Sequence, residues 1–203
     1  MTSTLYIVRH GNTFEHDEIP RRIGARSDPP LVESGRAQAV AVGRALHDAG
    51  VRFDRVIASP SRRARETAAM LLLSMNGPPM AVEQQPWLGE IDYRADEGRP
   101  EPDVVKRIGE NALIAWDRKG VAPPDWIIDR EMRLEGWRSL IDGVRREPQT
   151  ILLVASNGAA RFALFAGSIE TSSLPSLKLR TGAWGRLLVT ASGATLAEWD
   201  VHP

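Results

Sequence analysis

The sequence predicts an α/β fold, a three-layer sandwich in which a mainly parallel sheet is flanked by helices. Short apolar runs rich in β-branched residues alternate with longer segments whose apolar residues recur at helical spacing. Three of the apolar runs also end in polar residues, at Arg9-His10, at Ser59 and at Ser156-Asn157. Because ligands bind beyond the carboxyl ends of the strands in such sheets, we expect these three ends to share one crevice.

The first half of the chain is expected to supply two strand–helix units. The apolar run at residues 4–10 is typical of a buried strand, and the apolar residues of 35–50 recur near helical spacing. Ser34 stands where it could cap that helix. The run at 53–59 predicts a second strand, which a proline ends, and 61–74 predicts the second helix.

The middle of the chain combines one weak strand with loop and helix. "AVEQQ" at residues 81–85 indicates a short strand. Residues 86–102 indicate a loop, because glycine and proline recur along them. Helices are expected near 103–118 and 130–146. The shape of the long loop is the feature that the sequence predicts least.

The last third of the chain holds the strongest strand signal. "TILLVASNG" at residues 150–158 is apolar over most of its length, and 158–167 predicts the helix that follows it. The segment 184–200 predicts a closing β-hairpin with Ser192 and Gly193 at its turn. No internal repeat or low-complexity tract interrupts this order.

Composition limits the class of protein. The 203 residues fit one domain, which we expect to span 1–203. Lys+Arg 26 balance Asp+Glu 26, so the net charge indicates neither nucleic acid nor an anionic membrane as a partner. There is no cysteine, no signal peptide and no run near the roughly 20 apolar residues of a membrane span. We expect a cytoplasmic protein, and its oligomeric state is not predicted.

The residues expected at the shared crevice suit a phosphate group. Guanidinium groups such as those of Arg9 and Arg63 match the faces of a phosphate and bind it at two points. Helices that begin near residues 61 and 158 would add backbone N–H donors. Held among these groups, the neutral ring of His10 could attack phosphorus once a neighbouring carbonyl fixes its other nitrogen as N–H.

This site needs neither a metal nor a cofactor, because the arginines carry the counter-charge. The four histidines include no pair at helical ligand spacing, and there is no cysteine. The expected partner is a small phosphorylated substrate.

Three stretches in order, "RHGNT", "GARSDPPLVESGRAQA" and "SPSRRARETA", resemble the motifs of the histidine phosphatase superfamily, also called the phosphoglycerate-mutase-like family. The resemblance extends from residue 5 to about 165. It implies that His10 is the nucleophile that becomes phosphohistidine. It also implies that Arg9 and Arg63 clamp the phosphoryl group and that Thr13 lies near it.

A fourth stretch resembles the segment that carries the family's acid. "WLGEIDY" at residues 87–93 is similar to Leu-x-Glu-x-Asp-Phe, so Glu90 would protonate the leaving group. A carboxyl group in that role must hold a proton near neutral pH. Asp92 is the competing acid.

Three places depart from the family pattern, one of which is Arg94-Ala95-Asp96, where the family often has a glycine and an aromatic residue. Asn157 stands where the family has a second histidine, so it could donate one neutral hydrogen bond but brings no positive charge. His16 stands where an asparagine facing the phosphate is usual, and it could supply a donor or even the missing cation. The loop arginines at 21, 22 and 26 either reach an anionic group of the substrate or are simply solvated.

The leading hypothesis is therefore a metal-independent phosphomonoester phosphatase that works through a phosphohistidine at His10. One alternative is a mutase of the phosphoglycerate-mutase type, which needs a second anion site to hold the intermediate. Another is a catalytically impaired pseudoenzyme that binds a phosphorylated ligand, which Asn157 favours.

Overall fold

A six-stranded sheet runs through the middle of the protein, in the order β3-β2-β4-β1-β5-β6. The computed structural model describes residues 1–203. Its strands are β1 (Ser3–Arg9), β2 (Arg55–Ala58), β3 (Val82–Gln84), β4 (Thr150–Ala155), β5 (Trp184–Thr190) and β6 (Gly193–Val201). The first four pair in parallel, whereas β5 is antiparallel to β1 and β6. The predicted mainly parallel sheet is confirmed, with an antiparallel hairpin at one edge.

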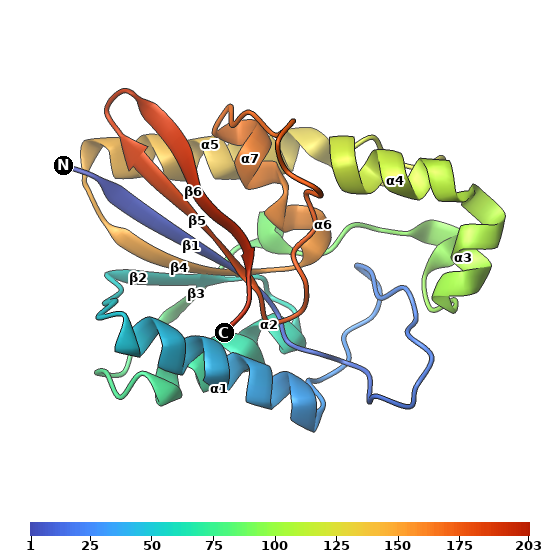
Figure 1. Cartoon of the computed structure of the whole chain (residues 1–203), viewed down its shortest axis with the longest axis horizontal. Coiled ribbons are helices and arrows are strands. Elements are labelled where there is room, and N and C mark those ends of the chain that lie inside the picture. The colour runs from blue at the N-terminus through green and yellow to red at the C-terminus, as the bar shows by residue number, and fades with distance from the viewer.

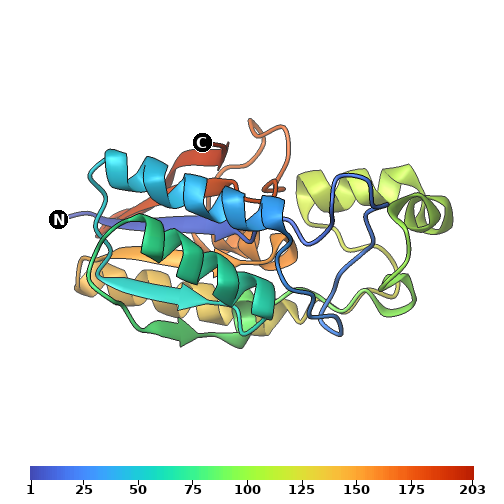
Figure 2. The same cartoon turned by 90° about the horizontal axis from the view of Figure 1, so that it is seen from below.

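Helices cover both faces of the sheet (Figure 1). One face carries α1 (Glu33–Asp48) and α2 (Arg62–Ser74), and the other carries α5 (Arg130–Arg146), α6 (Asn157–Ala160) and α7 (Phe162–Ala166). Beyond the end of the sheet, next to the loop that follows β1, lie α3 (Glu101–Ile108) and α4 (Glu110–Lys119), as Figure 2 shows. This end is the carboxyl end of the parallel strands, where ligands bind in such folds.

The two faces of β1 pack into two separate cores. Leu5 and Ile7 belong to the larger hydrophobic cluster, which includes residues of α5 and α7. Tyr6 and Val8 belong to the smaller cluster, with residues of α1 and α2. A strand that is buried on both sides is apolar at successive positions, which explains the unbroken apolar run in the sequence. The three-layer prediction is thus confirmed.

Two of the predicted helices are each divided in the structure. The segment 103–118 lies in α3 and α4, because Gly109 between them adopts a φ of 84°, which glycine tolerates best. The segment 158–167 forms α6 and α7, which are separated by Arg161. Its Nε donates to the carbonyl oxygen of Asn157 at 3.4 Å, so a side chain uses an acceptor of the helical ladder. The prediction of single helices was wrong in both places.

The helix starts use different groups from those expected. Val32 occupies the capping position of α1 without a side-chain hydrogen bond, so the predicted cap at Ser34 was wrong. At the start of α2, the Arg62 N–H donates to Oδ1 of Asp28 at 2.7 Å. A carboxylate from a distant loop therefore caps this helix, and the contact ties that loop to α2.

The remaining boundaries lie close to the predicted ones. Within 86–102 there are two short 3-10 turns, Pro86–Leu88 and Arg94–Asp96. The closing hairpin is confirmed, and its turn residues are Ala191 and Ser192, one residue earlier than expected.

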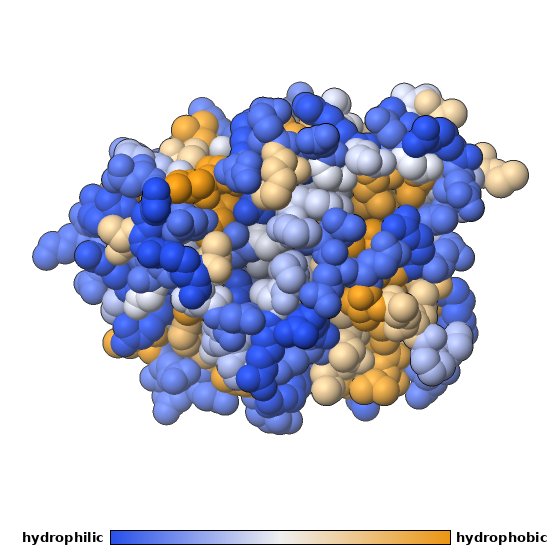
Figure 3. All heavy atoms as spheres, turned by 180° about the vertical axis from the view of Figure 1, so that it is seen from behind, coloured by the Kyte–Doolittle hydropathy of each residue, from blue (hydrophilic) through white to orange (hydrophobic).

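Several large apolar side chains are exposed on the surface. Exposed apolar side chains occur singly on different elements, such as Leu73 on α2 and Ile114 on α4. Figure 3 shows mostly hydrophilic atoms over the rear of the molecule, with hydrophobic atoms gathered mainly toward the right of the view. None of the helices combines the length and the apolar composition that crossing a bilayer requires.

Candidate active site

The first and third motifs meet at the carboxyl end of the sheet. His10 follows β1, and Arg63 lies in the first turn of α2, which follows β2. Nε of Arg63 donates to Nε2 of His10 at 3.2 Å. Their exposed fractions are only 6% for His10 and 2% for Arg63. The imidazole and the guanidinium group are therefore in direct contact, and both are buried.

The hydrogen bonds of His10 select one tautomer. Nδ1 lies 2.9 Å from the carbonyl oxygen of Gly11, which can only accept, so Nδ1 carries the hydrogen. Nε2 accepts from Arg63 and therefore keeps its lone pair. Burial, followed by the positive charges of Arg63 and Arg9, holds the pKa of His10 well below its ordinary value. The ring is thus neutral, and its unprotonated nitrogen points toward a guanidinium group.

We expect His10 to remain neutral as the pH falls through about 6.5, where an ordinary histidine takes up a proton. Because the pKa of His10 is lowered, the ring takes up its proton only at a more acidic pH. An NMR titration of the ring protons without phosphate should show no His10 transition near pH 6.5. In Arg63→Met the midpoint should move upward, because one of the two nearby positive charges is gone. A wild-type midpoint at or above 6.5 would contradict this prediction.

The glycines and the threonine of the motifs hold these groups together. A Cβ on Gly11 would lie 2.3 Å from the carbonyl oxygen of Gly35, so the end of β1 and the start of α1 touch through their backbones. Thr67 Oγ1 accepts from the Gly11 N–H at 3.1 Å and donates to the Arg63 carbonyl oxygen at 2.8 Å. All three motifs therefore act on the placement of His10 and Arg63.

Arg63 is held from a second side by the loop that carries the second motif. Its Nη1 donates to the Ser27 carbonyl oxygen at 3.0 Å and lies 3.8 Å from Oδ1 of Asp28. Asp28 also caps α2, so this one carboxylate orients both the helix and the arginine.

The backbone of one residue, Leu179, links Arg9 and Asn157. Nη1 of Arg9 donates to the Leu179 carbonyl oxygen at 2.8 Å, and the Leu179 N–H donates to Oδ1 of Asn157 at 2.9 Å. The oxygen of the Asn157 amide is thereby engaged, and its Nδ2 makes no hydrogen bond within the protein. Nε of Arg9 is buried without a partner. Both side chains thus keep free donors. Leu179 was missed in the sequence because it acts through its backbone.

Glu90 is brought against the end of β4. It is 9% exposed, and its two carboxyl oxygens accept from the N–H groups of Ile91 at 2.9 Å and Gly158 at 3.3 Å. A Cβ on Gly158 would lie 1.9 Å from Oε1 of Glu90. The glycine after Asn157 therefore leaves the space that the carboxyl group occupies. Asp92, the competing acid, instead lies 3.3 Å from Nε of Arg26 in an ion pair.

Two of the predicted phosphate-binding residues are not tied to this cluster. Thr13 is half-buried, and His16 lies exposed in a turn. Neither side chain makes a hydrogen bond or an ion pair with the other candidate residues.

The loop arginines are engaged with neighbouring loops. Arg21 donates to the Gly98 carbonyl oxygen, and Arg26 pairs with Glu97. Arg22 pairs with Glu101, and its guanidinium lies 5.0 Å from the ring centroids of both Tyr93 and Trp126. These contacts hold the loop after β1 onto the segment before α3. No group of three or more His, Cys, Asp or Glu side chains is arranged to hold a metal ion.

Comparison with known proteins agrees with this geometry. The model of the histidine phosphatase superfamily (branch 1) matches residues 5–202. The 2,3-bisphosphoglycerate-dependent phosphoglycerate mutase of Bartonella bacilliformis is 30% identical over 165 residues, covering 79% of each chain. That of Bartonella henselae is 27% identical over 187 residues, covering 90% of each.

Solved structures share the fold. Phosphoglycerate mutase from Bacillus anthracis superposes with a TM-score of 0.78 at 21% identity, covering 98% of this chain and 93% of that one. A mycobacterial glucosyl-3-phosphoglycerate phosphatase superposes with a TM-score of 0.75 at 20% identity, covering 98% and 99%. From the family match and these relatives, the chain belongs to the histidine phosphatase superfamily and is a phosphoryl-transfer enzyme of that family.

Proposed function

We propose that the protein is a metal-independent phosphomonoester phosphatase that works through a phosphohistidine at His10. The observation that carries the proposal is the buried, neutral Nε2 of His10 held against Nε of Arg63. A phosphate that enters this point meets a nucleophile and a fixed positive charge together. The family match supports phosphoryl transfer, and the hydrolytic outcome is our proposal.

In the first step, substrate oxygens replace His10 as acceptors of the Arg63 N–H groups. Nε2 then bonds to phosphorus while the bond from phosphorus to the ester oxygen breaks. Arg9, Arg63 and Nδ2 of Asn157 donate to the phosphoryl oxygens, whose charge they stabilise in a buried site. Protonated Glu90 gives its proton to the departing alcohol oxygen, and the carboxylate remains.

In the second step, water attacks the phosphohistidine. Glu90, now a carboxylate beside the Gly158 N–H, accepts a proton from this water. The bond from phosphorus to nitrogen breaks, inorganic phosphate leaves, and His10 returns to its neutral state. Thr13 and His16 would serve only if the loop after β1 brings them to the bound phosphate.

The direct test is incubation with phosphomonoesters, followed by rapid denaturation and a search for acid-labile phosphate on His10. We expect released inorganic phosphate and a phosphohistidine that forms at the rate of ester cleavage. No turnover of any ester, together with no labelled histidine, would overturn the proposal.

A mutase is the second candidate, and the phosphoglycerate mutases that are 27% and 30% identical to this chain favour it. A mutase returns the phosphoryl group to a bound intermediate before water reaches it. Incubation with 3-phosphoglycerate and 2,3-bisphosphoglycerate separates the two reactions. A phosphatase releases inorganic phosphate, whereas a mutase accumulates 2-phosphoglycerate.

Asn157→His is expected to raise kcat by about 10- to 100-fold. Removal of one transition-state donor typically costs on the order of a hundred- to a thousand-fold, and Asn157 retains a weaker donor. The Leu179 N–H could bond to one ring nitrogen of the new histidine, which leaves the other for the phosphate. Steady-state kinetics with one ester measures the change in kcat. The matched control is Asn157→Ala, which removes the amide donor.

The size of this gain also separates the remaining alternatives. An unchanged rate means that Asn157 already suffices. A gain from no detectable turnover to rapid turnover identifies the natural protein as a catalytically impaired ligand-binding form.

A further inference from the structure

A buried arginine on α5 binds the backbone of the turn that carries Glu90. Arg133 is 4% exposed. Its Nη1 donates to the carbonyl oxygens of Trp87 at 3.1 Å and Gly89 at 2.6 Å, and its Nη2 to that of Glu90 at 3.2 Å. Nε donates to the Ile128 carbonyl oxygen at 2.6 Å. One guanidinium group therefore holds three carbonyls within four consecutive residues.

The charge of Arg133 has no carboxylate in direct contact. It forms no ion pair, and burial lowers its pKa by more than Glu90 and Asp129 raise it. Four carbonyl dipoles replace water around the cation. Burying an arginine in this way costs free energy that a neutral, well-packed side chain would avoid. Its benefit must therefore lie in the fixed geometry of a planar group with several donors.

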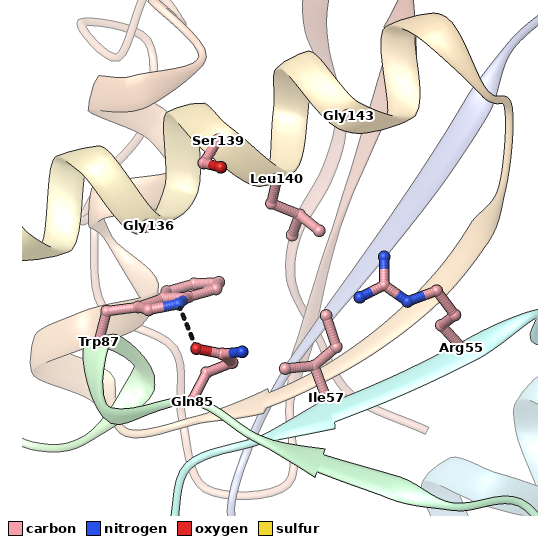
Figure 4. Close-up of a pocket in the computed structure, with 8 residues that line it drawn as sticks. All are labelled: Arg55, Ile57, Gln85, Trp87, Gly136, Ser139, Leu140 and Gly143. Carbon is pink, nitrogen blue, oxygen red and sulfur yellow. Dashed lines mark hydrogen bonds between the residues drawn. The ribbon is translucent and has the colours of Figure 1, made fainter.

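Helix α5 also contacts the segment that carries Glu90 at a second position, about one helical turn after Arg133. A Cβ on Gly136 would lie 2.4 Å from Cγ of Trp87, so the indole packs directly on the helix backbone. Figure 4 shows Trp87 beside Gly136, with its Nε1 bonded to Gln85 Oε1 at 3.1 Å. The ring also meets Trp137 edge-on at 4.9 Å. The turn is thus fixed both by its carbonyls and by its largest side chain.

A hollow of about 270 Å³ opens beside Trp87, between α5 and the strands β2 and β3 (Figure 4). The polar groups of Arg55 on its rim are already paired with Glu83. None of the candidate catalytic residues lines this hollow.

We propose that Arg133 is a positioning residue for the acid: by holding the Trp87, Gly89 and Glu90 carbonyls, it directs the Glu90 side chain onto the Gly158 N–H. This inference rests on the proposed role of Glu90 in the reaction. The carbonyl of Glu90 is bound on one side of its Cα, and its carboxyl oxygens are bound by Ile91 and Gly158 on the other. A residue held at both ends has little freedom to turn away from the leaving group.

The test compares two esters in Arg133→Met, Arg133→Lys and the control Arg138→Met, whose exposed arginine lies on the same helix. An alkyl phosphate needs the acid, whereas 4-nitrophenyl phosphate has a leaving group that departs without a proton. We expect kcat for the alkyl ester to fall about 30- to 100-fold in Arg133→Met, and that for the nitrophenyl ester by less than about threefold. Arg133→Lys should lie between, since its ammonium group keeps some donors.

A merely structural role gives a different pattern. If Arg133 only stabilises the fold, its loss lowers both rates by the same factor. Equal losses of the two rates, measured per folded molecule, would overturn the proposal. If Arg133→Met does not fold, Arg133→Lys carries the same comparison of the two esters.

A second measurement does not depend on turnover. Amide hydrogen exchange at Gly158 should quicken by about tenfold or more in Arg133→Met, because its acceptor on Glu90 is released, and it should not change in Arg138→Met. If the wild type hydrolyses neither ester, the proposed function fails, and this exchange alone decides the matter. Unchanged protection at Gly158 would then refute the positioning role.

Discussion

The variant His10→Asn is expected to lose turnover by on the order of 10⁴- to 10⁶-fold, as removal of a nucleophile does in other covalent enzymes. Asparagine is neutral and polar, and its oxygen could accept from Nε of Arg63, the group that now donates to the ring. The arginines that hold phosphate would remain, but no nitrogen lone pair would face phosphorus. Rapid-quench labelling and kcat for a nitrophenyl ester are the measurements.

His47→Asn provides the matched control. His47 lies in the last turn of α1 and makes no contact with the candidate site. We expect it to retain wild-type turnover, and both variants to melt within a few degrees of the wild type. Acid-labile phosphate in His10→Asn, or turnover above about 1% of the wild type, would show that another residue is the nucleophile.

The second large effect is expected for Arg63→Met, in which kcat/KM should fall by about 10³-fold, equivalent to about 4 kcal/mol of transition-state stabilisation. Methionine fills similar space but removes the fixed charge and the donors aimed at His10. It also leaves the Ser27 carbonyl oxygen without its partner. The value of kcat/KM and the affinity for vanadate should fall together, because the arginine binds both the ground state and the transition state. Steady-state kinetics measures the first and calorimetry the second.

The variant Arg62→Met separates the specific role of Arg63 from the general positive charge at the start of α2. Arg62 is the exposed neighbour on α2 and pairs with Glu66 at 2.7 Å. Its removal should change kcat/KM by less than about threefold, as expected for a surface ion pair. Equal losses in the Arg62 and Arg63 variants would mean that long-range charge, and not a clamp, binds the phosphate.

The layered architecture was predictable because its signals are local. A strand buried on both faces shows an apolar run, as in β1 and β4, and amphipathic helices show their period. The breaks within the helices were not predictable, because each depends on a distant partner or on one backbone angle. Gly109 could have been read as a helix terminator, because glycine tolerates the φ of 84° that it adopts between α3 and α4.

The candidate site was predictable where side chains form motifs. His10, Arg63 and Glu90 stand in recognisable stretches, and the structure brings them to one end of the sheet. Arg133 gave no such signal, because in the sequence it resembles any charged residue of an amphipathic helix. Only its burial and its four carbonyl partners distinguish it.

The link through Leu179 has a consequence for tracing activity across related genomes. This residue lies outside every motif, in the stretch between α7 and β5, yet its N–H engages the oxygen of the Asn157 amide and leaves the amide nitrogen without a partner. A relative with all its signature residues intact could present the carbonyl oxygen there instead and repel the anion. Surveys that count signatures alone would overlook that loss, whereas backbone geometry near this peptide would reveal it.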